Sequence, residues 1–175
     1  MKAIWLCAAM VLAVSAARAG EIDDLKAGKV QCYAPNLAKH TCAGFSRYTF
    51  SDTITNQAEL LLAPQPLVTM KTSSVVTIRG DEICGKVSKS DIDGATISVD
   101  GAPAPQAQAD AIRAQIWGAA FAQRDGKEIC TIYTPAPDGG YTTTYTMDGQ
   151  PDPSLPAATV ILIDPKDGYT LGMPG

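Results

Sequence analysis

The sequence predicts an α+β domain in which a mostly antiparallel sheet carries one main helix, about residues 105–124, on one of its faces. Three observations lead to this fold class. One long segment has helical periodicity, short runs of β-branched and aromatic residues occupy much of the rest, and six Asp-Gly pairs lie between or beside these runs. We expect residues 20–175 to form a single secreted domain that two disulfides stabilise.

Residues 1–19 have the three parts of a bacterial secretory signal peptide. Lys2 precedes an apolar run over residues 3–14, and small residues lead to Ala19. The apolar run is too short for a membrane-spanning helix. We therefore expect cleavage after Ala19, with Ala17 as the alternative, and a released product that is periplasmic or secreted.

The charge of the chain excludes one class of partner. The full sequence contains 14 Lys and Arg against 18 Asp and Glu, a formal charge of −4, and cleavage after Ala19 removes Lys2 and Arg18 to leave −6. An acidic domain lacks the electrostatic footprint of a nucleic-acid-binding protein. No second apolar run approaches membrane-spanning length. We expect no nucleic-acid partner and no membrane span, and the oligomeric state stays open.

Four cysteines remain after the predicted signal peptide. An even number in an exported protein indicates disulfides rather than free thiols. Of the three possible pairings, we expect Cys32 with Cys42, which closes a short loop, and Cys84 with Cys130, which joins the strands on either side of the helix. Zinc is the alternative, but the chain has no Cys-x-x-Cys pair and a single histidine, so we expect no metal and no cofactor.

Short strands are expected along most of the remaining chain. The predicted strands cover residues 45–50, 58–62, 67–70, 75–79, 83–87, 95–99, 141–147, 160–163 and 169–171. In the segment 141–147, Thr142, Thr144 and Thr146 alternate with larger residues, which predicts one solvent-facing side. Residues 160–163 are apolar without alternation, which is typical of a central strand buried on both faces.

Asp-Gly pairs favour tight hairpin turns because both residues tolerate positive φ angles. The six pairs begin at Asp93, Asp100, Asp125, Asp138, Asp148 and Asp167. Residues 89–100 also resemble a calcium-binding loop, but Lys89 occupies the first ligand position and Asp100 replaces the final bidentate glutamate. We therefore interpret the pair Asp93-Gly94 as a hairpin turn and not as a metal site.

The predicted helix has one apolar stripe and one aromatic pair. The stripe consists of Ala109, Ile112, Ile116, Ala119 and Ala120, at three- and four-residue steps. We expect it to pack on the sheet. Trp117 and Phe121 fall on the opposite side and, four residues apart, are neighbours. They form a candidate binding surface if they are exposed, and the alternative is a second layer of core, since large aromatics are highly buried on average.

A second candidate binding surface lies in the loop between Cys32 and Cys42. Residues 25–51 contain no acidic residue, and Lys39 and His40 lie beside each other within them. This basic stretch could receive an anionic ligand, and the simpler interpretation is a solvated loop. A loop closed by a disulfide loses less entropy when it binds.

The sequence contains no recognisable catalytic signature. It lacks a Gly-x-Ser-x-Gly motif and a phosphate-binding glycine loop, and bridged cysteines leave no thiolate nucleophile. We therefore expect a non-catalytic binding or interaction domain of the bacterial cell envelope, whose partner, an envelope protein or polymer, is not identified by the sequence. The alternative is a small hydrolase that acts on an envelope polymer through carboxylates that the sequence does not single out.

Overall fold

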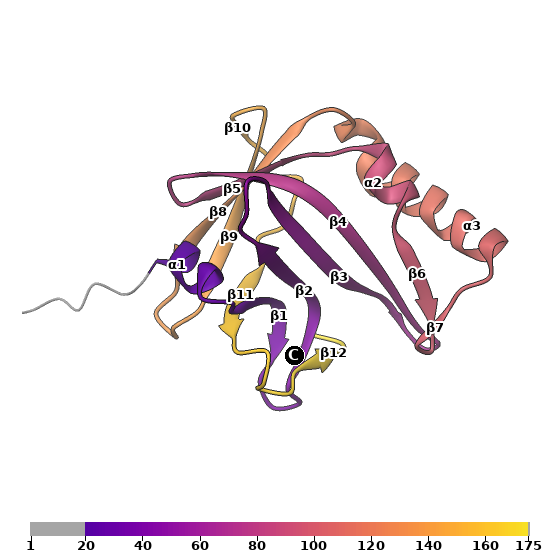
Figure 1. The fold of residues 1–175 in the computed structure, drawn as a ribbon, viewed down its shortest axis with the longest axis horizontal. Coiled ribbons are helices and arrows are strands. Elements are labelled where there is room, and N and C mark those ends of the chain that lie inside the picture. Colours follow the sequence, from indigo (N-terminus) through magenta and orange to yellow (C-terminus); the bar gives the residue numbers. More distant parts are fainter. Residues whose placement is uncertain (1–19, 175) are drawn as a thin grey trace, which may run out of the picture.

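The computed structural model describes residues 20–174, and most of this chain is β-strand (Figure 1). The strands are β1 (Val30–Asn36), β2 (Thr41–Thr49), β3 (Ile54–Pro64), β4 (Leu67–Arg79), β5 (Glu82–Lys86), β6 (Thr96–Val99), β7 (Ala102–Pro103), β8 (Glu128–Pro135), β9 (Tyr141–Met147), β10 (Gln150–Pro151), β11 (Thr159–Ile163) and β12 (Thr170–Leu171). The helices are α1 (Glu21–Lys26), α2 (Lys89–Asp93) and α3 (Gln106–Ile116). α3 continues as a π-helical turn (Trp117–Phe121) and a 3-10 turn (Ala122–Arg124).

Eight antiparallel strands of the described chain form a closed barrel. Around the ring they follow the order β1, β2, β3, β4, β5, β8, β9 and β11. The ring closes where β11 pairs with β1, with Val30 opposite Ile163 and Tyr33 opposite Val160. The predicted α+β fold, a sheet with a helix packed on one face, is therefore wrong. The sheet buries its inner face against itself, because closure pairs its first and last strands and removes its edges.

The helical segment covers an extension of the sheet beside the barrel. β3 and β4 form a long hairpin, in which the first half of β4 pairs with β6 and the second half pairs with β5. α3 packs on this extension, where Ala109 joins a small apolar core with Met70 and Ile97. Figure 1 shows α3 next to β6 and well away from β1 and β11. The helix thus shields the part of the sheet that ring closure leaves open.

The predicted apolar stripe of the helix is only partly correct. Ile112 and Ile116 pack against the core around Ala109, but Ala119 and Ala120 are exposed. The backbone changes from α to π hydrogen bonding at Trp117. Since a π turn spans five residues per hydrogen bond where an α turn spans four, the residues that follow rotate away from the predicted face.

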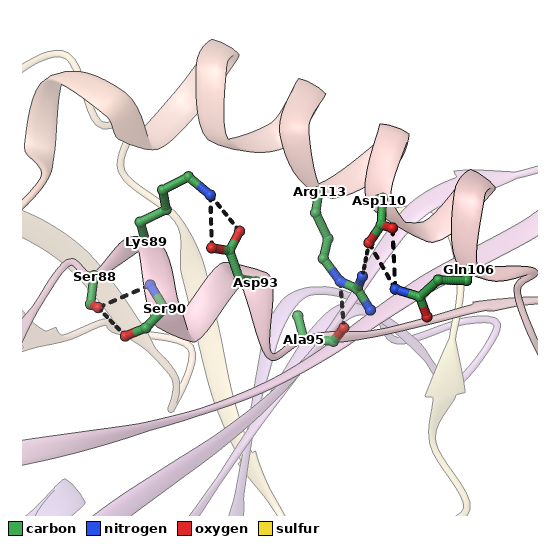
Figure 2. Close-up of polar contacts among 8 residues, drawn as sticks. All are labelled: Ser88, Lys89, Ser90, Asp93, Ala95, Gln106, Asp110 and Arg113. Atoms are coloured by element: carbon green, nitrogen blue, oxygen red, sulfur yellow. Dashed lines mark hydrogen bonds and ion pairs between the residues drawn. The ribbon is translucent and has the colours of Figure 1, made fainter.

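One polar contact joins α3 to the residue before β6, and further polar contacts lie within α3 and within α2 (Figure 2). The Arg113 guanidinium donates from Nε to the carbonyl oxygen of Ala95 at 2.8 Å and from Nη1 to Asp110 Oδ1 at 2.7 Å. On α2, Lys89 Nζ lies 2.6 Å from Asp93 Oδ1. These exposed ion pairs contribute little individually, so the buried apolar core is the main source of stability here.

The segment from residue 89 to residue 93 is a helix, and the predicted hairpin turn at Asp93-Gly94 is wrong. Ser88 begins α2 as its N-cap, and its Oγ accepts a hydrogen bond from the backbone N of Ser90 at 3.2 Å. Gly94 ends the helix as its C-cap. Serine at an N-cap satisfies a backbone donor that has no partner within the helix, and this local signal outweighs the turn preference of the Asp-Gly pair.

Two other Asp-Gly pairs form hairpin turns as predicted. Asp100 and Gly101 join β6 to β7 with φ angles of 50° and 81°. Asp148 and Gly149 join β9 to β10 with φ angles of 48° and 77°. Positive φ at both central positions is the geometry that favours Asp-Gly in two-residue hairpins.

The predicted alternation of strand residues is confirmed in part, and some predicted strand ends are wrong. The two strands predicted at 67–70 and 75–79 are halves of β4. In β9, Thr142 and Thr144 are exposed while Thr143 is fully buried, so the predicted alternation is confirmed there, whereas Thr146 is half-buried like its neighbours Tyr145 and Met147. β11 is buried on both faces: Val160 belongs to the barrel core and Ile163 to a second core.

Both predicted disulfides are confirmed. Cys32–Cys42 joins β1 to β2, and Cys84–Cys130 joins residues that face each other on β5 and β8. All four cysteines are at most 3% exposed. The two bridges are consistent with an extracellular or periplasmic location, where disulfides persist.

Within residues 20–174, no helix is both long and apolar enough to cross a membrane. The predicted signal peptide, residues 1–19, lies outside the described residues. Cys7 belongs to that segment, and the described cysteines are accounted for by the two bridges.

Removal of either bridge should destabilise the domain by an amount that follows the length of the loop it closes. The double substitution Cys84→Ala with Cys130→Ala opens a separation of 46 residues and is expected to lower the free energy of unfolding by about 4 kcal/mol. Cys32→Ala with Cys42→Ala opens a separation of 10 residues and should cost about 3 kcal/mol. Urea unfolding under non-reducing conditions measures both. A larger loss from the shorter loop would contradict the entropic explanation.

Candidate functional site

A group of five polar side chains crosses the interior of the barrel, and we call it the central cluster: Glu21, Gln31, Tyr33, Tyr48 and Tyr133. Gln31 is fully buried, and its Nε2 donates to Glu21 Oε1 at 2.5 Å. Its Oε1 accepts from the hydroxyls of Tyr33 and Tyr48, each at 3.0 Å. The hydroxyls of Tyr33 and Tyr133 lie 2.8 Å apart. The cluster therefore satisfies a buried amide that would otherwise oppose folding.

Different parts of the barrel supply these side chains. Alternation along β1 directs Gln31 and Tyr33 inward, while β2 provides Tyr48 and β8 provides Tyr133. Glu21 comes from the first turn of α1, which covers one end of the barrel. The cluster thus lies between two cavities, one beside α1 and one beside α2, and Tyr133 lines both.

Burial sets the protonation of the central cluster. Desolvation raises the pKa of Glu21 to about 7, with a further rise from Asp81 and an opposing effect of the Gln31 hydrogen bond. Desolvation also raises the pKa values of Tyr33, Tyr48 and Tyr133 above the usual value for tyrosine. The phenols therefore remain neutral hydrogen-bond donors, and Glu21 is the member of the cluster that titrates near neutral pH.

The α2-end cavity, with a volume of 290 Å³, lies inside the barrel where α2 and the end of the helical segment approach it. Its walls are largely apolar and include Leu60, Met70, Val76, Ile83, Ile92 and Ile129. Polar groups from the strands interrupt these walls, among them Asn56, Thr72, Ser74 and Thr131. An apolar cavity with a few convergent polar groups is typical of a small-molecule site.

Asn56 supplies the buried acceptor of this cavity that has unused hydrogen-bonding capacity, whereas Arg124 Nε, which also lacks a hydrogen bond, lies 3.5 Å from the carboxylate of Asp152. Asn56 Oδ1 is buried, and no donor among the described residues lies within hydrogen-bonding distance. Asn56 faces Ser74 across the pairing of β3 with β4, and both line the cavity. A buried acceptor without a partner costs about 1 to 3 kcal/mol, so the cavity contains an acceptor that a ligand donor would satisfy.

The mouth of the α2-end cavity is formed by Phe121, Arg124, Leu155 and residues of α2. The Arg124 guanidinium donates from Nη2 to Ser154 Oγ at 2.7 Å, and its Nε lies 3.5 Å from Asp152 Oδ2. These contacts attach the loop that carries Leu155 to the end of the helical segment. The mouth is therefore formed by elements that are held together by a buried charged group.

The predicted candidate residues do not converge on one site. Phe121 lines the α2-end cavity, whereas Trp117 is half-buried with the ammonium of Lys89 at 6.0 Å from its ring centroid. Lys39 and His40 are exposed in the turn between β1 and β2. His40 stacks on Tyr169, with ring centroids 4.9 Å apart.

No pattern in the sequence marks Glu21, Gln31 or Asn56 as candidate site residues. Gln31 and Tyr33 do show the period-two spacing of a strand, but alternation alone does not tell which side faces the core. Glu21 precedes the first strand in an acidic run that resembles an exposed helix start. Asn56 lies two residues before the predicted strand 58–62, so no signal marked it as an inward residue.

The α1-end cavity is larger, with a volume of 510 Å³, and it is more acidic. Glu21, Asp24 and Asp81 line it together with the ammonium group of Lys29, which lies 2.9 Å from Asp24 Oδ1. The rings of Tyr133 and Tyr141 also line it.

One group of potential metal ligands occurs among the described residues. The donor atoms of Glu82, Cys84 and Cys130 lie within 4.8 Å of one another, but the two sulfurs are bonded to each other. Metal coordination by cysteine requires the thiolate, so this group does not fit a metal ion while the disulfide is intact.

No family model, no curated protein and no solved structure matches the chain. The functional assignment therefore depends on the chemistry of the two cavities. Each cavity contains a buried acceptor that lacks a partner, and the α2-end cavity is the one whose walls are largely apolar.

The raised pKa of Glu21 makes stability depend on pH in a defined window. The folded protein holds the Glu21 proton up to about pH 7, while the ordinary pKa of this group is 4.5. The free energy of unfolding should therefore be highest below the unfolded value and fall by about 3 kcal/mol as pH rises from about 4.5 to about 7.

Urea unfolding across this window tests the effect, and Glu21→Gln should abolish most of the slope. Asp23→Asn, an exposed position on the same helix, serves as the control and should keep the wild-type slope. Stability that rises with pH between 5 and 7 would contradict the assignment.

Proposed function

We propose that the chain is an exported binding protein that holds a small, largely apolar molecule with one hydrogen-bond donor in the α2-end cavity. The unpaired Oδ1 of Asn56 is the observation that carries the proposal, because it is a buried acceptor inside a mostly apolar cavity. Closed barrels of eight strands have interiors of the size that holds one small ligand.

The volume of the cavity limits the size of the ligand. At 290 Å³ it lies near the lower end of the range for ligand pockets, about 300 to 1,000 Å³. A molecule of one or two rings fits this space better than an extended chain. The largely apolar walls disfavour a highly charged ligand, because a charge loses its hydration there, although Lys86, Asp91 and Arg124 also belong to the lining.

The proposal keeps the binding role expected from the sequence and replaces the envelope polymer with a small molecule. A polymer needs a long groove that lets the chain pass, whereas the α2-end cavity has a volume of 290 Å³ and is lined mainly by inward-facing strand residues of the barrel. The two disulfides support an oxidising compartment, and the signal-like residues 1–19 support export to the periplasm or beyond it.

The alternative role as a hydrolase has weaker support. Carboxylates gather at the α1-end cavity, but Asp24 is paired with Lys29 and one oxygen of Glu21 is held by Gln31. Sugar hydrolysis needs two carboxyl groups that flank the scissile bond, one of them ionised and free to act. Asp81 forms no ion pair among the described residues, but it is exposed at the turn between β4 and β5, so the cavity has one free carboxylate at its surface and no second one beside it.

Filling the α2-end cavity should abolish binding of a small aromatic probe. Indole combines a two-ring apolar body with one N–H donor, and we expect it to bind the wild-type protein with a measurable heat by calorimetry. Ser74→Leu adds a bulky side chain inside the cavity and should weaken indole binding at least tenfold, about 1.4 kcal/mol. Ser73→Leu, on the exposed face of the same strand, is the matched control. Equal binding by both variants would place the indole site elsewhere.

The donor requirement is tested with indene, which has the shape of indole without the N–H group. Wild-type protein should prefer indole to indene by about fivefold to tenfold, the value of one hydrogen bond to a buried acceptor. Asn56→Leu removes the acceptor and should reverse the preference. The four affinities form a double-mutant cycle, and a coupling free energy near zero would show that Asn56 does not contact the ligand.

A further inference from the structure

The α1-end cavity contains a second acceptor without a partner. Glu21 is 6% exposed, and it lines the cavity although it belongs to the central cluster. Its Oε1 accepts the Gln31 hydrogen bond, but Oε2 is buried and has no donor within hydrogen-bonding distance among the described residues. A buried carboxylate is costly unless it is protonated or paired with a cation.

We propose that the α1-end cavity binds an ammonium group through Glu21 and Asp81. A protonated amine supplies both the N–H donor that Glu21 Oε2 lacks and a compensating positive charge. Lys29 already neutralises Asp24 at 2.9 Å, whereas Asp81 forms no ion pair among the described residues. Asp81 is exposed at the turn between β4 and β5, so it lies where a cation would enter.

Aromatic rings complete the site. Tyr133 and Tyr141 line the cavity, and their rings meet edge to face at 86° with centroids 6.5 Å apart. The face of a tyrosine ring attracts ammonium ions, and the attraction grows when the cation loses water. Carboxylates together with aromatic ring faces favour an organic amine over a metal ion, because a ring face attracts an organic cation and the phenol of Tyr133 is already hydrogen-bonded to Tyr33.

An ammonium group could reach Glu21 from two sources. One is a free organic amine, and the other is the α-amino group of Gly20, which lines the cavity and would become the chain terminus after cleavage at Ala19. The volume of 510 Å³ favours the free amine, because an α-amino group alone would fill little of it. The α1-end site does not depend on the ligand of the α2-end cavity.

Binding of a cation should also depend on pH. The titratable and charged groups near Glu21 are Asp24, Lys29, Asp81, Tyr33, Tyr48, Tyr133 and Tyr141. Burial raises the pKa of Glu21 to about 7, so a cation must compete with a proton in neutral solution. The affinity for an amine should rise more than tenfold between about pH 5 and about pH 8.

The experiment uses n-propylammonium, which stays protonated over this range, and n-propanol as the uncharged control. Calorimetry or NMR titration is carried out on the protein that begins at Gly20, with its amino group free or acetylated. We expect the amine to bind both forms and the alcohol to bind neither. Glu21→Gln should weaken amine binding at least tenfold, Asp81→Asn severalfold, and Asp23→Asn not at all.

The source of the ammonium group is decided by comparing the two forms. One outcome would assign the site to the protein's own terminus. In it, the amine binds only the acetylated form, and the α-amino pKa of the free form is lower in Glu21→Gln than in the wild-type protein. The proposed site is overturned if Glu21→Gln changes neither amine affinity nor the α-amino pKa.

Because Glu21→Gln removes a buried ionisable group, circular dichroism and urea unfolding are expected to show a folded variant. Loss of indole binding in Ser74→Leu is a separate outcome that leaves the α1-end site unaffected.

Discussion

The hydrogen bonds of the Gln31 side chain are the interaction on which the interior of this barrel depends. A fully buried amide has to find partners on both its oxygen and its nitrogen, and here it finds two phenols and a carboxyl group. Each partner comes from a different element, so the amide fixes the positions of α1, β1 and β2 relative to one another. The same group divides the lumen into two cavities instead of one continuous channel.

Ring closure explains both the barrel and the position of the helix. The ring uses the second half of β4, while the first half continues past the barrel and pairs with β6. That extension has an apolar face around Met70 and Ile97 that would otherwise contact water. α3 covers it with Ala109, whose small side chain allows close packing. The π-helical turn then places Phe121 over the α2-end cavity.

Local features were predictable from the sequence, and the closure of the sheet was not. The disulfides follow from cysteine number, the faces of β9 from alternation, and the helix from its periodicity, because each signal lies within a few residues. The pairing of Val30 with Ile163 joins the two ends of the domain, and no local pattern distinguishes it from an open sheet. The site residues depend on that closure: Gln31 and Asn56 are polar residues that become interior only when the ring forms.

The two cavities differ in chemistry, since one is lined by carboxylates and the other largely by apolar side chains, and the central cluster lies between them. Phenols with raised pKa values form a neutral layer between an acidic cavity and an apolar one. A charge at Glu21 is therefore separated from the α2-end cavity by groups that do not ionise near neutral pH. Two connections join the cavities: Tyr133 lines both and hydrogen-bonds to Tyr33, and Gln31 links Glu21 of the α1-end cavity to Tyr33 and Tyr48 of the α2-end cavity. The proposed amine and the proposed apolar ligand are therefore compatible with each other, because the carboxylates of the α1-end cavity pair the charge of the amine on the far side of the neutral phenols.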